Sequence, residues 1–247
     1  MKAKNFIFLV FISIISINNS IADEVNTIYS LSLDVLGVDV KVAVIKSKLN
    51  IKNEKYQFSF TLEPEKLISF ISPITGNGNV YGEIDNSILT PINYDYTYIK
   101  KNKIKNTKIK FNNSNVIKSS TTPSFDKDKL SPIHTHALNN VIDPITGIIY
   151  IGDYILNNGC TITYKIYDGK RRYDLDYTDK FYKNGFTICR LSQKKIGGFK
   201  LKNQQNTTFE PAYEIDTYFK KENDRYILKK IISKGRFSNI LIDVFYD

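Results

Sequence analysis

The chain lacks the residue patterns on which most enzyme assignments rest. Its 247 residues include two histidines, two cysteines, one methionine and no tryptophan. It contains no G-x-S-x-G nucleophile elbow and no glycine-rich phosphate loop. The carboxylates are scattered through predicted strands and turns, so no pair is marked as a general acid and base. We therefore expect a protein that is not an enzyme and that needs no cofactor.

Long hydrophobic runs are absent after residue 22. A transmembrane helix needs about 20 apolar residues, so we expect no membrane span in the mature chain. Before that point, two lysines precede an apolar run over residues 6–17, and small residues follow at Ser20 and Ala22. This pattern predicts a signal peptide over residues 1–22 and a single exported β-rich domain over residues 23–247.

The chain has fewer acidic than basic residues. Lys and Arg number 35 and Asp and Glu number 25, so the formal net charge is +10, and loss of the two signal-peptide lysines leaves +8. A positive surface favours anionic envelope partners such as lipid headgroups, lipopolysaccharide or acidic glycans, although the same charge also serves solubility alone. Nucleic acid is not an expected partner, because the chain is exported and has no Arg-Gly or helix-turn-helix pattern. The oligomeric state is left open.

Cys160 and Cys189 are the two cysteines. An even count in an exported chain predicts one disulfide, which would stabilise the fold by about 3–4 kcal/mol in the chain-entropy model. A redox pair is the alternative, but the C-x-x-C spacing that lowers a thiol pKa is missing. A metal site needs more ligands than two cysteines supply.

Alternation of hydrophobic and polar residues dominates the chain. Residues 29–35, 38–44 and 56–62 show it before the midpoint, and residues 160–166 and 173–178 show it afterwards. Each segment predicts a strand with one buried and one wet face. Hairpin signals such as Leu36-Gly37 and Asp168-Gly169 separate the strands. We find no internal repeat and no linker that would divide the chain into two domains.

Residues 64–91 depart from this alternation, because they contain three prolines and three glycines. They predict a long loop carrying a short helix. This helix would either gate an opening or plug the core. The gate residues are Leu67, Ile68, Phe70 and Ile71.

Residues 134–156 form the second departure. Their apolar residues recur at helical spacing, and Pro144 predicts the start of a second helix with Asp143 as its N-cap. An apolar helical segment beside a meander of strands is expected to pack on the concave side of the sheet.

Two clusters are candidate binding sites. His134 and His136 would share one face of a strand and form a weak candidate metal site, for which a third ligand would have to come from elsewhere, such as Asp126, Asp128 or Asp143. Lys170, Arg171 and Arg172 concentrate positive charge on one hairpin and would contact an anion or a partner. The alternative for the hairpin is an internal lattice of ion pairs with nearby aspartates.

The residues Cys160…Tyr167-Asp168-Gly169-Lys170-Arg171-Arg172-Tyr173-Asp174-Leu175…Cys189-Arg190 resemble the domain-of-unknown-function 3108 family of uncharacterised proteobacterial exported proteins. The similarity extends over most of the mature chain. It implies a periplasmic location in a Gram-negative cell and a shape similar to the lipoprotein-carrier half-barrel. The family has no established activity, so the resemblance assigns no catalytic residue.

These observations predict a mainly β protein. We expect a single strongly curved antiparallel sheet of about ten strands or a little more, a half-open barrel with one or two helices packed in the concavity. The function we expect is binding of a lipid or another apolar ligand in that concavity, in maintenance of the cell envelope. An envelope scaffold with a filled core is the alternative, and a cell-wall or glycan hydrolase is a third.

Overall fold

The computed structural model describes most of the chain beyond the predicted signal peptide, which lies outside the described residues. The described ranges are 23–71, 73–86, 88–101, 103–150, 160–201, 214–222, 225–235 and 238–246. In these ranges no helix is long and apolar enough to cross a bilayer.

Thirteen strands form one antiparallel sheet. They are β1 (Asp23–Val35), β2 (Val38–Lys52), β3 (Lys55–Pro64), β4 (Ile74–Asp85), β5 (Ile88–Lys100), β6 (Lys103–Asn112), β7 (Asn115–Thr122), β8 (Thr163–Tyr167), β9 (Arg172–Lys183), β10 (Phe186–Gly197), β11 (Glu214–Glu222), β12 (Arg225–Ser233) and β13 (Asn239–Tyr246). The described helices are α1 (Lys66–Ile71) and the 3₁₀ turns η1 (Lys127–Lys129) and η2 (Thr135–Leu138), together with a helical segment over residues 144–150.

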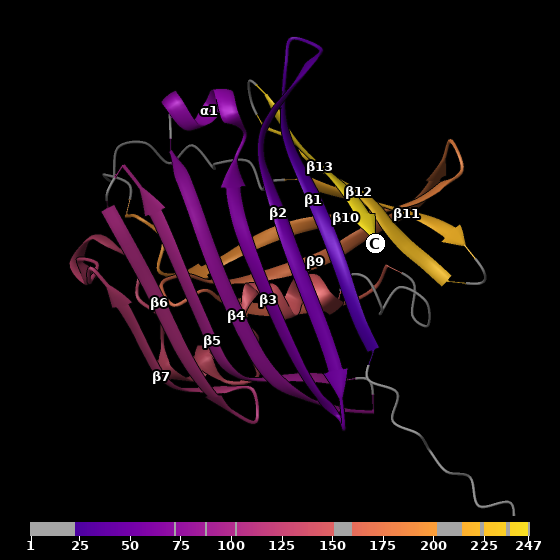
Figure 1. Cartoon of the computed structure of the whole chain (residues 1–247). Coiled ribbons are helices and arrows are strands. Elements are labelled where there is room, and N and C mark those ends of the chain that lie inside the picture. Colours follow the sequence, from indigo (N-terminus) through magenta and orange to yellow (C-terminus); the bar gives the residue numbers. More distant parts are fainter. Residues whose placement is uncertain are drawn as a thin grey trace, which may run out of the picture.

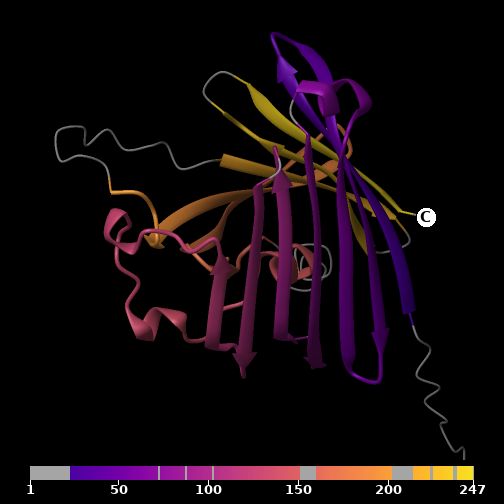
Figure 2. The same ribbon diagram turned by 60° about the vertical axis from the view of Figure 1, so that its left-hand side comes forward.

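The sheet is a meander whose first and last strands also pair. Strands β1 to β7 are neighbours in chain order, as are β8 to β13, and β1 pairs with β13. The open edges are therefore β7 and β8. In Figures 1 and 2, β1–β7 form one wall, β8–β13 cross behind it, and the 144–150 helix lies between them. The predicted curved antiparallel sheet with a helix in its concavity is confirmed.

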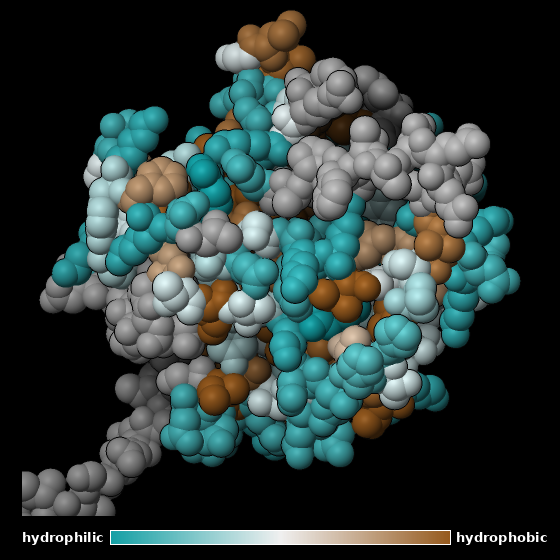
Figure 3. All heavy atoms as spheres, turned by 180° about the vertical axis from the view of Figure 1, so that it is seen from behind, coloured by the Kyte–Doolittle hydropathy of each residue, from teal (hydrophilic) through white to brown (hydrophobic). Residues whose placement is uncertain are grey.

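The inner face follows from the alternation in sequence. On β3, Tyr56 and Phe58 are buried, whereas Lys55 before them and Gln57 between them are exposed. Successive side chains of a strand point to opposite faces, so one set faces the helix and the other faces solvent. Seen from behind, the outer surface shows hydrophobic residues in small separate groups among hydrophilic ones (Figure 3).

The prediction of a long loop over residues 64–91 is wrong for most of its length. A short helix is present as α1, but β4 and the start of β5 occupy residues 74–85 and 88–91. The three glycines of this segment lie in β4, and Gly78 and Gly82 lie beneath the rings of Phe60 and Tyr56 of β3. A Cβ atom on Gly82 would lie 2.4 Å from Cε1 of Tyr56. Glycine in a strand here marks a close approach of a neighbouring side chain.

The predicted helical region 134–156 is helical only in parts. Residues 135–138 form the turn η2, residues 144–150 form a helix that begins at Pro144 as predicted, and residues 151–156 lie outside the described residues. Between the two helical parts the backbone is extended. Asn140 has a φ of +53°, and a residue before proline avoids the helical region, so one continuous helix does not form.

This extended stretch fills the opening between the sheet edges. The Val141 N–H donates to the Ser114 carbonyl (2.8 Å) at the β6–β7 turn. On the other side, the Ile142 N–H donates to the Lys165 carbonyl and the Tyr167 N–H donates to the Ile142 carbonyl, both at 2.9 Å. Backbone groups of the edge strand β8 and of the β6–β7 turn therefore find partners. These hydrogen bonds stabilise Val141 and Ile142 in an extended conformation, although their spacing in the sequence is helical.

Candidate functional site

Five aromatic side chains line the concave face of β3 and β5, and we call them the aromatic stripe: Phe58, Phe60, Tyr94, Tyr96 and Tyr98. Neighbouring ring centroids lie 5.9 to 6.5 Å apart. Phe58 and Tyr94 are buried, at 7% and 6% exposure, whereas the other three rings are half-buried. The stripe thus runs from the core toward the end of the sheet where β5 meets β6.

A glycine in the strand between them allows these rings to meet. Gly78 on β4 is the register partner of both Phe60 and Tyr96. A Cβ atom on Gly78 would lie 2.2 Å from Cε1 of Phe60, so the Phe60 ring occupies the place of a side chain. The Phe60 and Tyr96 rings stack across the intervening strand, with an interplanar angle of 26°.

Four lysines surround the accessible end of the stripe, and we call them the lysine rim: Lys100, Lys101, Lys103 and Lys105. Tyr98 pairs with Lys105 and Lys100 pairs with Lys103, so alternation places three of the lysines on the concave face beside Tyr98. Together with Tyr98 the four lysines line a hollow of about 380 Å³. Within the part of the chain that the structure describes, none of the four forms an ion pair.

The predicted gate residues all fall in α1, at the same end of the sheet. Leu67, Ile68, Phe70 and Ile71 belong to this helix, which joins β3 to β4, and Figures 1 and 2 show it at the rim above these strands. The Lys101 N–H donates to the carbonyl of Pro73 (3.5 Å), just after α1. Of the four gate side chains, the structure describes Ile68, which is half-buried.

The remainder of the concavity is occupied by the 144–150 helix. Asp143 caps it, accepting hydrogen bonds from the N–H groups of Ile145 (2.9 Å) and Thr146 (3.0 Å) and from the Thr146 hydroxyl (2.6 Å). That hydroxyl also lies 2.9 Å from the Tyr56 hydroxyl of β3. Complete burial raises the pKa of Asp143, although these hydrogen bonds favour the carboxylate. The predicted N-cap is confirmed, and all of its contacts serve to hold the helix.

Tyr150 fixes the helix to another strand. Its hydroxyl donates to the Leu89 carbonyl (3.1 Å) and accepts from the Leu89 N–H on β5. Because the helix is bonded to β3 and β5 in this way, protein atoms fill that half of the concavity. The hollow beside the lysine rim lies at the end of β5 opposite Leu89.

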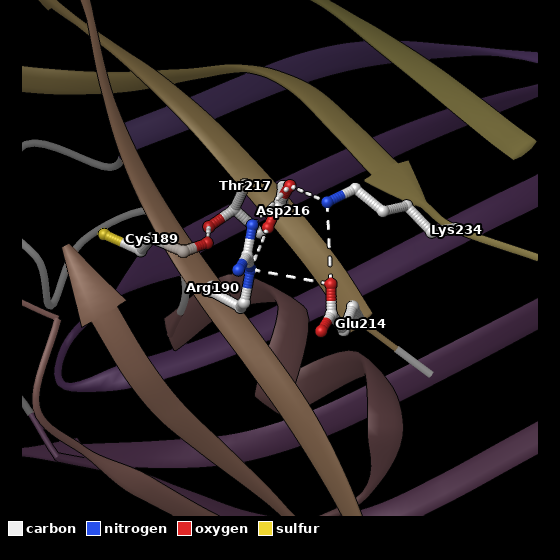
Figure 4. A network of polar contacts seen from close by, with 6 residues as sticks. All are labelled: Cys189, Arg190, Glu214, Asp216, Thr217 and Lys234. Atoms are coloured by element: carbon white, nitrogen blue, oxygen red, sulfur yellow. Dashed lines mark hydrogen bonds and ion pairs between the residues drawn. The ribbon is translucent and has the colours of Figure 1, made fainter. Parts of the chain in front are cut away.

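A network on β10 and β11 was not foreseen from the sequence. The Arg190 Nε donates to Asp216 Oδ1 (2.8 Å), and Lys234 Nζ lies 3.0 Å from Asp216 Oδ2 (Figure 4). The same lysine and arginine also approach Glu214, at 3.5 and 3.9 Å. Burial is the largest single influence on the pKa of Asp216, and it raises that pKa. Arg190 and Lys234 together outweigh burial and hold the pKa below the ordinary value. The carboxylate is thus neutralised by its neighbours and stabilises the strand pair.

The two histidines lie beside each other on the surface. Both are exposed, and their rings stack at a centroid distance of 5.6 Å. Among the described residues, no group of three or more His, Cys, Asp or Glu side chains is arranged to hold a metal ion. The structure thus places no third ligand beside His134 and His136.

Comparison with known proteins identifies the family. Residues 27–227 match the family described as "Protein of unknown function (DUF3108)". The chain belongs to the DUF3108 family. No curated protein matches the chain. Among solved structures, a beta-barrel-like protein of domain of unknown function DUF1849 from Brucella abortus is similar, with a TM-score of 0.47 and 9% identity over 91% of this chain and 97% of the other.

The cysteines of this DUF3108 chain form the predicted disulfide. Cys160 and Cys189 are bonded, with their Cα atoms 5.6 Å apart, and both are buried. The bond attaches the segment just before β8 to the first half of β10. The Thr217 hydroxyl donates to the Cys189 carbonyl (2.8 Å), so the neighbouring strand also holds this position.

The charged hairpin of this DUF3108 chain has its arginines in different environments. Arg171 is exposed, and its Nε donates to Asp168 Oδ2 (2.7 Å). Arg172 is 4% exposed, and its guanidinium donates to the Ala137 carbonyl (2.8 Å) and to Asp174 (2.6 Å). These are the ion pairs that the alternative interpretation expected. Arg172 therefore lies in the interior and holds the η2 region against β9.

Lys170, the third member of this hairpin, lies beside residues of both signs. Its Nζ is 5.8 Å from the centroid of the Phe125 ring. The adjoining hollow, of about 560 Å³, is lined by Asp126 and Asp128 as well as by lysines. The lysine rim, in contrast, presents lysines without an acidic residue among its lining groups.

Proposed function

We propose that this DUF3108 protein binds an amphiphile with an anionic headgroup, as an exported, non-enzymatic protein of the periplasm of a Gram-negative cell. The apolar part of the ligand would lie on the aromatic stripe, and its headgroup would contact the lysine rim. The observation that carries the proposal is that Tyr98 belongs to both surfaces, so that a half-buried apolar track ends directly at four lysines.

The chemistry of the two surfaces matches an amphiphile. Aromatic rings present large apolar areas, and half-buried rings gain from contact with an acyl chain because more of their surface leaves water. An ammonium group is a strongly hydrated point charge that binds phosphate without needing a fixed geometry. A flexible lysine rim therefore suits headgroups of the phosphate class.

The proposal limits the site to the rim half of the concavity, because the 144–150 helix occupies the other half. In this arrangement α1 would act as the gate, since it lies between β3 and β4 at the end of the stripe. A substitution of Ile68→Ser is expected to speed ligand release without abolishing binding.

Short-chain phospholipids below their micelle concentration test the proposal. We expect titration calorimetry to show binding of a short-chain phosphatidylglycerol and much weaker binding of the matching phosphatidylcholine. The double variant K103E/K105E should bind phosphatidylglycerol about tenfold more weakly or worse, since each lysine near an anionic headgroup contributes about 1 kcal/mol.

The matched control is K110E/K118E. Lys110 and Lys118 are register partners on β6 and β7 and are exposed, and their substitution changes the net charge by the same amount. This control should bind like the unaltered protein. Equal losses of affinity in both variants would show that binding depends on net charge alone and not on the lysine rim. Absence of binding by the unaltered protein would favour the scaffold alternative.

A further inference from the structure

The turn between β1 and β2 carries a leucine where neither packing nor backbone preference requires one. Leu36 is 98% exposed and has a φ of +55°, and Gly37 follows with a φ of +84°. Two-residue hairpin turns with both φ values positive favour Asn, Asp or Gly at the first position. Leucine in the left-handed region costs conformational energy, and at this exposure it gains no contacts in return.

The residues around Leu36 add further apolar side chains to the tip, beside the register pair Asp34 and Asp39. Val35, Val38 and Val40 are 45%, 63% and 41% exposed. Ile240 on β13, the register partner of Leu33, adds a further exposed side chain at 43%. An exposed cluster of this kind on a soluble domain marks a contact surface. We call the residues Val35–Val38 together with Val40 the apolar tip.

The turn is rigid enough to present these side chains. The Gly37 N–H donates to Asp34 Oδ1 (2.9 Å), and the Asn239 side chain donates to Asp34 Oδ2 (3.2 Å). Asp34 therefore holds the turn and connects it to the start of β13. The backbones of the two strands pair with each other up to the tip. Strand β2 pairs with β3 only from Ala43 onward, so residues 38–41 project beyond the neighbouring strand.

The apolar tip lies at the same end of the sheet as the lysine rim. In an antiparallel meander, the β1–β2 turn, the β3–β4 connection and the β5–β6 turn share one end, and the β2–β3, β4–β5 and β6–β7 turns share the other. Figures 1 and 2 show the β1–β2 hairpin projecting beyond the wall on the side of α1. From behind, the same hairpin ends in a projecting hydrophobic group at the top of Figure 3.

We infer that this end of the molecule docks on an anionic lipid bilayer, with Leu36 entering the interface and the lysine rim facing the headgroups. A projecting apolar group with basic residues at the same end is the combination that binds peripheral proteins to anionic membranes. A projecting hairpin can enter a deformable lipid surface, and the positive charge of the rim favours a negatively charged one. The inference uses the rim only as a source of charge and does not require a ligand on the aromatic stripe.

A single tryptophan reports on the tip, because the chain has none of its own. The test uses the exported protein, with its N-terminus checked by mass. The variant L36W is mixed with vesicles of equimolar phosphatidylglycerol and phosphatidylcholine. We expect its emission to shift to the blue and to be quenched by lipids brominated in the acyl chain. The control I88W places the probe on a residue that is 60% exposed beside the β4–β5 turn, at the opposite end, and its emission should stay unchanged.

A second variant tests the contribution of the leucine without a probe. L36N suits the left-handed turn, so the fold is retained, and vesicle sedimentation should show about tenfold weaker binding. Short-chain phosphatidylglycerol binding should be unaffected by L36N, which separates this inference from the proposed ligand site.

Several outcomes would overturn docking through the tip. These are vesicle binding by L36N equal to that of the unaltered protein, shifts of equal size in L36W and I88W, and absence of vesicle binding altogether. Loss of a dimer in L36N, measured by light scattering, would assign the tip to a second copy of the chain and overturn the inference as well.

Discussion

The ring of Phe60 on β3 stacks on the ring of Tyr96 on β5 across an intervening strand, with centroids 5.9 Å apart. The contact exists because Gly78 lies between them without a side chain. A glycine in the middle of a strand is ordinarily a weakness. Here a neighbouring ring covers it, and the covered glycine joins the aromatic residues of two strands into one surface.

Substitution of this glycine should therefore disrupt the stripe. We expect G78A to displace the Phe60 ring, since its Cβ would overlap that ring, and to lower the free energy of unfolding by about 1–3 kcal/mol. Urea denaturation measures the change. The control N79A alters the neighbouring exposed position on the outer face and should stay within about 0.5 kcal/mol. A well-tolerated G78A would show that the ring moves freely.

The two arginines of the charged hairpin should differ in their effect on stability. Removal of Arg172 by R172A leaves the Asp174 carboxylate and the Ala137 carbonyl without a buried partner, and we expect a loss of about 3–5 kcal/mol. R171A breaks an ion pair at the surface and should cost less than about 1 kcal/mol. Thermal unfolding of both variants decides this, and equal losses would contradict the assignment of Arg172 to the interior.

Asp216 should make stability depend on pH in the acid range. Its pKa is held below the ordinary value by Arg190 and Lys234 despite burial, so the unfolded chain binds the proton more readily. The contribution of Asp216 is therefore present above the ordinary aspartate pKa and is lost as the pH falls through the lower folded value. Unfolding measured over this pH range should show that D216N loses less stability on acidification than the unaltered protein does. An unchanged pH profile would remove Asp216 from the acid response.

Asp143 should act in the opposite direction. Burial raises its pKa in the folded protein, so the folded state binds the proton more readily than the unfolded chain. Stability from this group is present below the ordinary aspartate pKa and is lost as the pH rises through the raised folded value. D143N keeps an oxygen to cap the helix, and its stability should no longer decline over that window. The two aspartate variants thus serve as controls for each other in one set of unfolding curves.

Loss of the disulfide should destabilise the protein without changing its topology. Cys160 and Cys189 are 29 residues apart, for which the chain-entropy model gives about 3–4 kcal/mol. The double variant C160A/C189A should match the unaltered protein in the presence of reductant, as measured by urea denaturation. A much smaller loss would indicate that the unfolded chain retains structure around this loop.

The correct and incorrect predictions have distinct physical origins. The strands around Tyr56 and Phe58 and the N-cap at Asp143 were predicted because alternation and capping depend on residues close in sequence. The disulfide was predicted because the chain has two cysteines. The β4 strand was missed because Gly78 and Gly82 interrupt the alternation of hydrophobic and polar residues. Their role becomes clear only from the rings of Phe60 and Tyr56, which lie on another strand.

The candidate site could be predicted only in part. The helix α1 was expected from its apolar residues, but no local pattern indicates that the rings of Phe60 and Tyr96 stack across an intervening strand. The sequence predicted a turn at Leu36, but it did not predict that the leucine side chain would be exposed. The sequence of the charged hairpin left two interpretations open, an anion or partner contact and an internal lattice of ion pairs. The structure shows that Arg172 turns inward, where it donates to Asp174 and to the Ala137 carbonyl.

The sequence by itself determined the alternating strands, their turns, the disulfide and the helix start, because each depends on near neighbours or on simple pairing chemistry. Only the tertiary structure decided that β1 meets β13, that residues 140–142 occupy the opening between β7 and β8, and that an aromatic stripe ends at a lysine rim. These features depend on the register between strands, which brings together residues that no local pattern relates.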